Sequence, residues 1–377
     1  MILPGATLGM LGGGQLGRLF VLAAREAGYR VLVVDPDADS PAGRLADEHI
    51  CADYDDADAL TRLARECAAV TTEFENIPAD ALRTLARDVA VHPSAEAVAT
   101  TQDRLREKSF LRGLGLPTAP FAAIHAAADL TEAAGTVGFP AILKRASFGY
   151  DGKGQVRVAG PKELAAAFAS LGGVTCVLER RIDLVREVSI VLARGERGNT
   201  ASYPLADNIH RGGILALSSV PAQIDEALSA KAVEMAVRIV EGLDYCGVLA
   251  VEFFVARDGA LLVNEIAPRP HNSGHFTVDA CVSSQFEQQL RALCGLPLGE
   301  TRLLSPVAMV NLLGDRWQSG APRWERLYST PGARLHLYGK REARPGRKMG
   351  HFCVLADTVE EAVRRARALD EALSTPA

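Results

Sequence analysis

The chain opens with two apolar runs separated by a segment of helical period. Residues 6–11 (ATLGML) and 29–35 (YRVLVVD) have the short, continuous pattern of buried strands, whereas apolar residues in 15–28 recur with the spacing of a helix. Two strands that flank a helix form a βαβ unit, which predicts a parallel sheet with a right-handed crossover. A later apolar run, AAVTTEFENIP at 68–78, adds another strand to this α/β region.

Acidic side chains follow that later strand directly. Glu73, Glu75 and Asn76 come where the apolar run ends. The carboxyl ends of strands are where open α/β sheets bind ligands, although solvated loop acids would give the same pattern.

A second pattern, in residues 246–267 (CGVLAVEFFVARDGALLVNEIA), predicts a β-hairpin. Two apolar runs flank Asp258-Gly259, a strong signal for a two-residue turn. If those two residues form the loop, Glu252 lies directly opposite Glu265. Facing carboxylates destabilise a sheet, so a positive group is expected between them. Mg²⁺ would suit this position, and a nearby lysine or arginine is the alternative.

The segment 139–159 (FPAILKRASFGYDGKGQVRVA) reads as strand, glycine-rich loop and strand. Lys144 ends the first strand, and Gly149, Gly152 and Gly154 let the loop backbone approach a ligand closely. A lysine beside such a loop favours a phosphate-binding site, although an ordinary flexible hairpin is the alternative. The Walker pattern G-x-x-x-x-G-K-[ST] is absent.

Composition narrows the classes of partner. Net charge is −5 over 377 residues, which argues against a nucleic-acid surface. No apolar run reaches membrane-spanning length, and the seven scattered cysteines without a CxxC pair indicate reduced thiols in the cytoplasm. A local cluster of five basic residues nevertheless lies within 338–351 (YGKREARPGRKMGH), where two or three cations could hold one phosphate.

A different class of function is suggested by the first glycines. Gly12, Gly14 and Gly17 match G-x-G-x-x-G, and Asp35 has about the spacing of a ribose-binding acid. Taken alone, this pattern indicates an NAD-dependent dehydrogenase. The motif is weak, because tight strand-to-helix turns use glycine for packing alone.

Lys144, the loop SFGYDGKGQ, Glu252 and Asn264-Glu265 together resemble the ATP-grasp superfamily. The segments GGGQLGR near the start, APRPHNSGH at 267–275 and RPGRKMGH at 344–351 resemble the N5-carboxyaminoimidazole ribonucleotide synthetases within it. The resemblance implies a mixed α/β and α+β fold with three parts. These are a Rossmann-like parallel-sheet domain at 1–98, an ATP-grasp domain at 99–300 with a glycine-rich lid at about 110–175, and a small β-rich C-terminal domain at 301–377.

The resemblance also implies site residues. The ATP site would comprise Arg104, Lys144, Gly149, Tyr150, Asp151, Gly152, Lys153, Gly154, Gln155, Glu179, Arg180, Arg181, Ile182, Glu187, His210, Asn264 and Glu265. The ribonucleotide would contact Tyr150, Asp151, Arg269, His271, Asn272 and Ser273, with its phosphate on Lys340, Arg347 and Lys348. Glu252 and Glu265 would hold Mg²⁺, and Asp151, Lys144 and Arg269 would be catalytic. A catalytic role for His275 is less favoured, because a lone histidine after a glycine is more often structural.

The implied reaction joins ATP, bicarbonate and 5-aminoimidazole ribonucleotide through carboxyphosphate, in a cytoplasmic homodimer that binds neither nucleic acid nor membrane. Alternatives are a formate-dependent glycinamide ribonucleotide transformylase, a biotin-carboxylase-like enzyme, the NAD-dependent dehydrogenase and a non-catalytic nucleotide-binding module. Dependence on bicarbonate or formate would separate the ligases. The dehydrogenase leaves the 144–155 loop and the Glu252/Glu265 pair unexplained.

Overall fold

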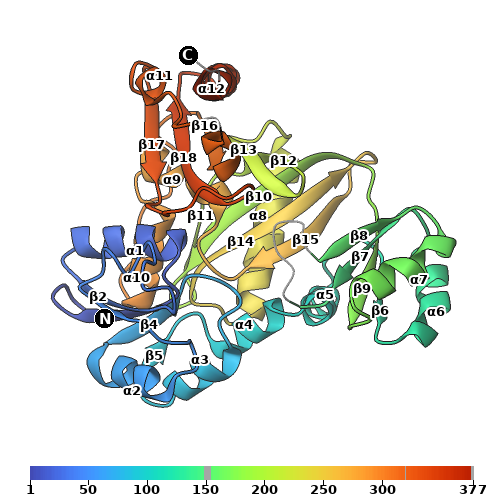
Figure 1. Cartoon of the computed structure of the whole chain (residues 1–377), viewed down its shortest axis with the longest axis horizontal. Helices are drawn as coiled ribbons and strands as arrows, with labels where there is room; N and C mark the ends of the chain where they lie inside the picture. Colours follow the sequence, from blue (N-terminus) through green and yellow to red (C-terminus); the bar gives the residue numbers. More distant parts are fainter. Residues whose placement is uncertain (148–153, 319, 375–377) are drawn as a thin grey trace.

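The computed structural model describes residues 1–147, 154–318 and 320–374, and within them the strands form three sheets (Figure 1). The N-terminal sheet has five parallel strands in the order β3-β2-β1-β4-β5, which confirms the predicted parallel α/β region. Its elements are β1 (Thr7–Leu11), α1 (Gln15–Glu26), β2 (Arg30–Val34), β3 (Glu48–Ile50), α2 (Ala57–Glu66), β4 (Ala69–Thr72), α3 (Ala79–Leu85) and β5 (Ala90–Val91).

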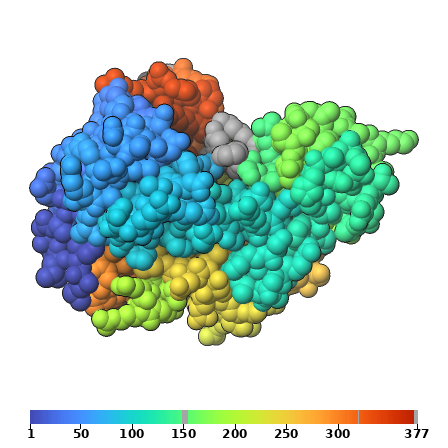
Figure 2. All heavy atoms as spheres, turned by 90° about the horizontal axis from the view of Figure 1, so that it is seen from below, coloured from blue at the N-terminus to red at the C-terminus, as the bar shows by residue number. Residues whose placement is uncertain are grey.

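A second sheet is antiparallel and has four strands, in the order β6-β9-β7-β8. Two helices lead into it: α4 (Ala95–Thr101) and α5 (Arg104–Gly113). The sheet and its cover comprise β6 (Phe121–Ile124), η1 (Ala127–Asp129), α6 (Leu130–Val137), β7 (Ala141–Arg145), β8 (Gln155–Val158), α7 (Pro161–Ser170) and β9 (Cys176–Arg180). The space-filling view shows this green part and the blue N-terminal sheet at opposite ends of the molecule (Figure 2).

The third sheet has nine strands and occupies the centre. The order is β15-β14-β10-β12-β13-β16-β18-β17, and β11 also pairs with β10. Its first part comprises β10 (Leu184–Arg194), β11 (Thr200–Ser202), β12 (Ala206–Arg211), β13 (Ile214–Val220), α8 (Glu226–Gly242), β14 (Gly247–Ala256), β15 (Leu261–Ala267), η2 (Asn272–Gly274), α9 (Thr277–Ala280) and α10 (Gln285–Leu293). Helix α8 packs its apolar face on β10 and β14 and forms one buried core with them.

The C-terminal strands extend this central sheet, because β16 pairs with β13. The elements are β16 (Val307–Leu313), η3 (Gly314–Trp317), α11 (Trp324–Tyr328), β17 (Ala333–Leu337), β18 (Lys348–Leu355) and α12 (Val359–Ser374). They nevertheless have an apolar core of their own, in which α12 packs on β16 and β18. The C-terminal β-rich part is therefore confirmed, and the domain boundaries given above stay a proposal.

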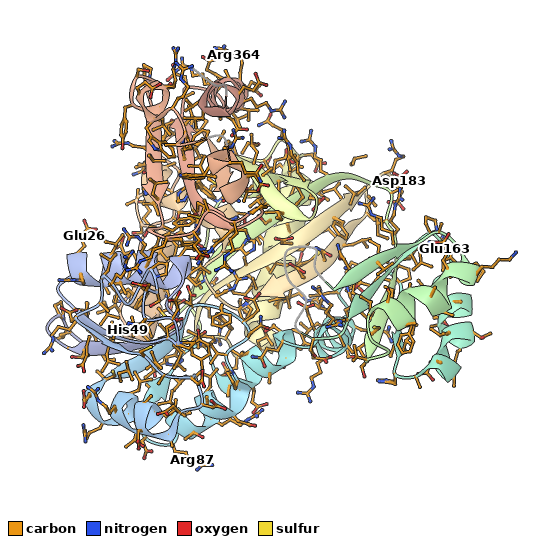
Figure 3. All side chains as sticks on the ribbon, in the orientation of Figure 1. Glu26, His49, Arg87, Glu163, Asp183 and Arg364 are labelled. Atoms are coloured by element: carbon orange, nitrogen blue, oxygen red, sulfur yellow. The ribbon has the colours of Figure 1, made fainter. Side chains whose placement is uncertain are left out.

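Charged side chains that lie away from the sheets mark the outer surface. Glu26, Arg87, Glu163 and Arg364 are exposed and lie at the periphery (Figure 3). In the described residues, no helix has both the length and the apolar character needed to span a membrane.

Candidate functional site

The two predicted metal carboxylates face each other across the central sheet. Glu252 on β14 pairs with Glu265 on β15, as expected. The expected two-residue turn is wrong, because Ala256 N–H donates to Ala260 O and the loop has three residues, with Gly259 at φ +83°. That extra residue alone would place Glu252 opposite Asn264. A bulge between Phe253 and Glu252 makes Asn264 the extra residue and restores the predicted pair.

Both carboxylates have a nitrogen partner. Arg104 Nη1 lies 3.2 Å from Glu265 Oε2, and His271 Nε2 lies 3.4 Å from Glu252 Oε1. Burial, followed by the charge of Glu265, raises the pKa of Glu252 to about 7. Arg104 therefore supplies one of the two positive groups considered from the sequence, and Glu252 remains beside a like charge.

A cluster of two lysines around one acid lies where the second sheet meets α5. Lys144 Nζ is 3.0 Å from Glu179 Oε2, and Lys108 Nζ is 3.4 Å from Glu179 Oε1. Burial alone would raise the pKa of Glu179, but Lys144 and Lys108 outweigh it and lower the value to about 2. The charge of Arg104 acts on both Glu179 and Glu265, so this cluster adjoins the carboxylate pair.

Lys108 was not among the predicted site residues, although its side chain is only 1% exposed. It lies on α5 beside Glu107, whose Oε1 accepts a hydrogen bond from Ile266 N at 2.6 Å. Burial raises the pKa of Glu107 to about 7. In the sequence both residues belong to the charged run DRLREK, which gives no sign that one side of the helix is buried.

Glu187 and His210 lie on neighbouring strands at the same face. His210 Nδ1 is 2.8 Å from Glu187 Oε2. Burial lowers the pKa of His210, but the bond to Glu187 and the charge of Glu252 raise it above its usual value. These two predicted nucleotide residues therefore adjoin the carboxylate pair.

The N-terminal part reaches this site through one ion pair. Arg269, in the segment after β15, binds Glu75, which follows β4. Burial alone would raise the pKa of Glu75, but Arg269 lowers it to about 2, and Lys348 contributes. Of the acids after β4, Glu75 therefore contacts a predicted site residue, and its role at a ligand stays a prediction.

The glycine turn before α1 has no free place for a dinucleotide pyrophosphate. Gly14 N and Gly17 N donate to the carboxylate of Glu73 at 2.6 and 2.8 Å, and Gly13 N donates to Asp35 at 2.6 Å. The chain's own acids therefore occupy the amides that an NAD pyrophosphate would need. The dehydrogenase interpretation is wrong for this reason.

The predicted phosphate cations lie in the segment between β17 and the start of β18, and they have different partners. Lys340 Nζ donates to Gln15 Oε1 at 2.7 Å, and Arg347 Nη1 donates to Glu342 O at 3.1 Å. Lys348 begins β18 and lowers the pKa of both Glu75 and Glu252. Within this basic segment Lys348 therefore borders the carboxylates, whereas Arg341 and Arg344 are exposed and pair with Asp39 and Glu342.

Asn272 is buried, and neither side-chain atom has a hydrogen-bond partner among the described residues. A buried amide normally binds something, so this side chain fits a ligand. His275 differs, because it lies in a buried ring cluster with Phe286, Tyr338 and His351, and Gln285 Nε2 is 3.0 Å from its Nδ1. This environment favours the structural role for His275.

Some predicted residues are not brought into these contacts. Gly149, Tyr150, Asp151, Gly152 and Lys153 lie outside the described residues. Arg180, the last residue of β9, and Arg181 after it are exposed, with Ile182 next in the chain. Gln155 begins β8 and pairs with Lys144, and Gly154 precedes it.

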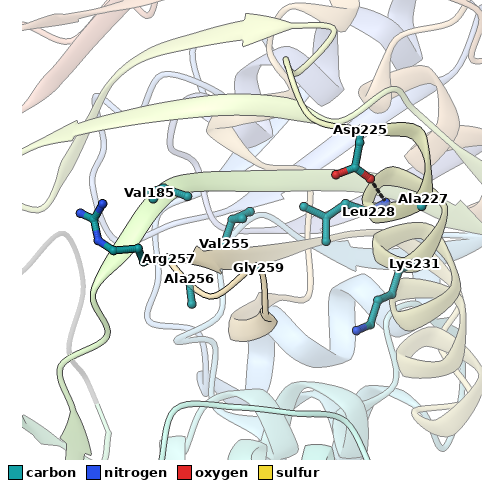
Figure 4. Close-up of a pocket in the computed structure, with 9 residues that line it drawn as sticks. All are labelled: Val185, Asp225, Ala227, Leu228, Lys231, Val255, Ala256, Arg257 and Gly259. Atoms are coloured by element: carbon teal, nitrogen blue, oxygen red, sulfur yellow. Dashed lines mark hydrogen bonds between the residues drawn. The ribbon is translucent and has the colours of Figure 1, made fainter.

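A separate pocket lies at the tip of the β14–β15 hairpin. Its lining includes Lys231, Arg257 and Asp225, whose carboxylate caps α8 by accepting from Leu228 N at 2.7 Å (Figure 4). Arg257 is already paired with Asp183. The pocket contains none of the predicted site residues, and the carboxylate pair remains the candidate site.

Three family models match successive parts of the chain. They describe a ribonucleotide synthetase preATP-grasp domain at residues 5–102, an ATP-grasp domain at 109–286 and a phosphoribosylaminoimidazole carboxylase C-terminal domain at 307–365. Their order follows the three regions of the fold.

Curated relatives and solved structures agree with these matches. N5-carboxyaminoimidazole ribonucleotide synthases of Bacillus subtilis (strain 168) and Brucella melitensis are 43% and 46% identical, over 96% and 92% of this chain and 94% and 96% of their own. A synthetase solved as an ADP complex has a TM-score of 0.93 and 44% identity, covering 98% of this chain and 97% of its own. The Aspergillus clavatus synthase, solved with ADP and 5-aminoimidazole ribonucleotide, has a TM-score of 0.90 and 32% identity, covering 98% of both chains. The chain belongs to the N5-carboxyaminoimidazole ribonucleotide synthases, the ATP-grasp ligases of purine biosynthesis.

Proposed function

We propose that this chain uses ATP to activate bicarbonate and transfers the carboxyl group to the amine of 5-aminoimidazole ribonucleotide. The observation that carries the proposal is the facing pair Glu252 and Glu265, bordered by Arg104 and by the Lys144–Glu179 cluster. Carboxylates beside cations can hold a metal nucleotide and its transferred phosphate.

Mg²⁺ fits the carboxylate pair because the donor set is made of hard oxygen atoms. Glu252 and Glu265 would hold it, with the amide oxygen of Asn264 adjacent. Two carboxylates in register, one of them beside a like charge in a buried position, gain from a divalent cation. When bound, the ion would neutralise charge that develops on the phosphate oxygens.

The chain's own groups then have separate tasks. Lys144 and Arg104 would bind phosphate oxygens, and Glu187 would accept hydrogen bonds from the ribose hydroxyls. Gly149, Gly152, Gly154, Lys153 and Gln155 would close over the phosphates, while Glu179 to Ile182 would face the base. Excluding water is necessary because carboxyphosphate hydrolyses readily.

The ribonucleotide would lie on the other side of the carboxylates. The buried amide of Asn272 supports this position, because residues 1–147, 154–318 and 320–374 offer it no hydrogen-bond partner. Arg269, His271 and Ser273 would contact the ring and ribose, and Tyr150 and Asp151 would approach the amine. Lys340, Arg347 and Lys348 would hold the 5′-phosphate, as a cluster of cations suits. A cytoplasmic location accords with the seven free cysteines, and the homodimer stays a prediction.

The test is ADP release by the purified chain at controlled bicarbonate, with and without 5-aminoimidazole ribonucleotide, and with formate and glycinamide ribonucleotide as the competing pair. We expect ADP and carboxylated product to form together only with bicarbonate and the aminoimidazole. Glu252→Gln and Glu265→Gln should lower turnover about 100-fold or more, since each loses several kcal/mol of charge stabilisation. Glu26→Gln, at an exposed position, is the matched control. Formate-dependent turnover would instead assign the transformylase reaction.

A further inference from the structure

A row of polar side chains crosses one face of the central sheet toward the carboxylate pair. Ser218 Oγ lies 2.6 Å from Asn208 Oδ1, Asn208 Nδ2 lies 2.8 Å from Ser189 Oγ, and Ser189 Oγ lies 2.7 Å from Ser273 Oγ. These four side chains are on β13, β12, β10 and η2, and none is more than 7% exposed. Polar groups that are buried this deeply are costly unless each one is satisfied, and here each one satisfies the next.

The row continues to His271. Ser273 Oγ is 2.9 Å from His271 Nδ1, and Ser273 N donates to the same Nδ1 at 3.3 Å. On the other side of the ring, His271 Nε2 is 3.4 Å from Glu252 Oε1. Ser189 and Glu252 are cross-strand partners, so the row leaves the sheet at Ser189 on β10 and returns to it at Glu252 on the neighbouring strand β14.

One backbone amide determines the direction of every bond in the row. A backbone N–H can only donate, so the bond from Ser273 N makes His271 Nδ1 an acceptor. The Ser273 hydroxyl must then donate to Nδ1 and accept from Ser189. Ser189 in turn accepts from the Asn208 amide nitrogen.

The two ends of the row follow from this direction. Asn208 Oδ1 is left to accept from Ser218, and the ring hydrogen of a neutral His271 is left on Nε2, facing Glu252. An imidazolium would carry a hydrogen on Nδ1 and could not accept from Ser273 N, so this contact itself requires a neutral ring.

We propose that Ser189, Asn208 and Ser218 are positioning residues that hold His271 as the Nε2–H tautomer and direct its N–H to Glu252. The proposal deepens the proposed function, because Glu252 is the carboxylate assigned there to the metal nucleotide. A contact from Nε2–H to one oxygen, at 3.4 Å, would orient the carboxylate and leave its other oxygen for the cation. Groups that orient a metal ligand in this way typically change metal affinity about 10- to 100-fold.

The sharpest variant is Asn208→Asp, because it keeps the shape and removes the donor. An ionised carboxylate at position 208 accepts from both Ser218 and Ser189. Ser189 then accepts from Ser273, and the Ser273 hydroxyl is no longer available to His271 Nδ1. We expect the ring hydrogen to move to Nδ1, where the Ser273 hydroxyl oxygen at 2.9 Å would accept it and the longer 3.3 Å bond from Ser273 N would be lost. Histidine ¹⁵N NMR at pH 8, with the His271 signal identified by its loss in His271→Gln, reads the tautomer directly.

Ser189→Ala interrupts the row without adding charge, and Ser189→Thr restores a hydroxyl. The matched control is Ser219→Ala, since Ser219 is buried on β13 next to Ser218 and points to the opposite face. Mn²⁺ binding in the presence of ADP, measured by EPR, should weaken about tenfold in Ser189→Ala and Asn208→Asp. It should recover in Ser189→Thr and stay at the wild-type value in Ser219→Ala.

Two results would overturn the proposal. One is a wild-type His271 with its hydrogen on Nδ1 or divided between the nitrogens. The other is a pair of observations made together. Asn208→Asp keeps the Nε2–H tautomer, and Ser189→Ala binds Mn²⁺ as tightly as Ser219→Ala does. Both readings are made without bicarbonate or ribonucleotide. A failed carboxylation assay would therefore contradict the proposed function, whereas the tautomer and Mn²⁺ measurements would remain an independent test of this proposal.

Discussion

Buried ion pairs hold the charged side chains of this site in place. The sequence predicts some of these side chains as site residues but not all of them. Lys144, Glu179 and Glu252 stand at the ends of apolar runs or within them, so their placement at a ligand edge could be predicted. The placement of Lys108 could not be predicted. Its burial depends on contacts with Glu179 on β9 and with the Phe121 ring on β6, and not on the residues next to it in the sequence. The ring cluster around His275 could not be predicted either, since it joins α10, β18 and Tyr338, which follows β17.

Lys108 provides the first prediction at this scale. Lys108→Met keeps most of the side-chain volume but removes the charge beside Glu179. Lys108 Nζ is in an ion pair with Glu179 at 3.4 Å but makes no hydrogen bond with the described residues. A charge-assisted contact from it to a phosphate would be worth about 1.5–3 kcal/mol, so we expect the KM for ATP to rise about tenfold or more. Steady-state kinetics with varied ATP provide the measurement, and Lys162→Met, on the exposed side of α7, is the control. Equal KM values in the two variants would show that Lys108 has no role at the nucleotide.

The Glu75–Arg269 pair predicts a dependence of stability on pH. The folded-state pKa of Glu75, about 2, lies below its unfolded value of about 4.3, so the stabilisation is present above pH 4.3 and is lost as the pH falls toward 2. The full linkage amounts to about 3 kcal/mol, because each pKa unit is worth about 1.4 kcal/mol. Glu75→Gln should therefore lower Tm at pH 7.

The difference in Tm from wild type should shrink as the pH is lowered from 5 to 3. Thermal unfolding followed by circular dichroism across this range measures it, with Glu26→Gln as the exposed control. A Tm difference that stays constant from pH 7 to pH 3 would mean that packing, and not the charge of Glu75, stabilises the contact.

The β14–β15 hairpin shows how a correct position can follow from an incorrect turn. Hydrophobic alternation and Asp258-Gly259 predicted the two strands and the facing carboxylates. The loop has one residue more than expected, and the bulge at Asn264 compensates for it. A bulge has no reliable signature in a single sequence, because it depends on the local twist of the strands and on the direction in which a side chain has to point.

Two variants of this hairpin separate the effect of the bulge on activity from the effect of the Asn264 side-chain amide. Deleting Asn264 brings Glu265 opposite Glu252 without a bulge, so the pairing survives while the carboxylate is re-aimed. Asn264→Ala keeps the bulge and removes only the amide oxygen. We expect kcat of the deletion variant to be more than tenfold lower than kcat of Asn264→Ala. The Tm of each variant should stay within a few degrees of wild type. Equal activities would assign the effect to the amide alone.

At the scale of the molecule, the site is assembled from three regions that are distant in sequence. The parallel N-terminal sheet was predictable, since each βαβ unit is local. The pairing of β13 with β16 could not be predicted. The two strands are almost a hundred positions apart, and their pairing depends on how each one packs in the folded molecule. The same limit applies to Glu75, which follows a strand as expected but owes its role to Arg269.

The last prediction tests that assembly. Lys348 begins β18, and its charge reaches both Glu75 and Glu252, so it stands where the three regions meet. Lys348→Ala should raise the KM for 5-aminoimidazole ribonucleotide about tenfold or more, the effect of losing a charge-assisted contact of about 1.5–3 kcal/mol. The KM for ATP should change little. Arg344→Ala is the control, because Arg344 belongs to the same basic segment but its side chain is 70% exposed and pairs with Glu342. If both KM values rose together in Lys348→Ala, the lysine would serve the nucleotide or the junction of the regions, and the 5′-phosphate would have to be held by Lys340 and Arg347 without it.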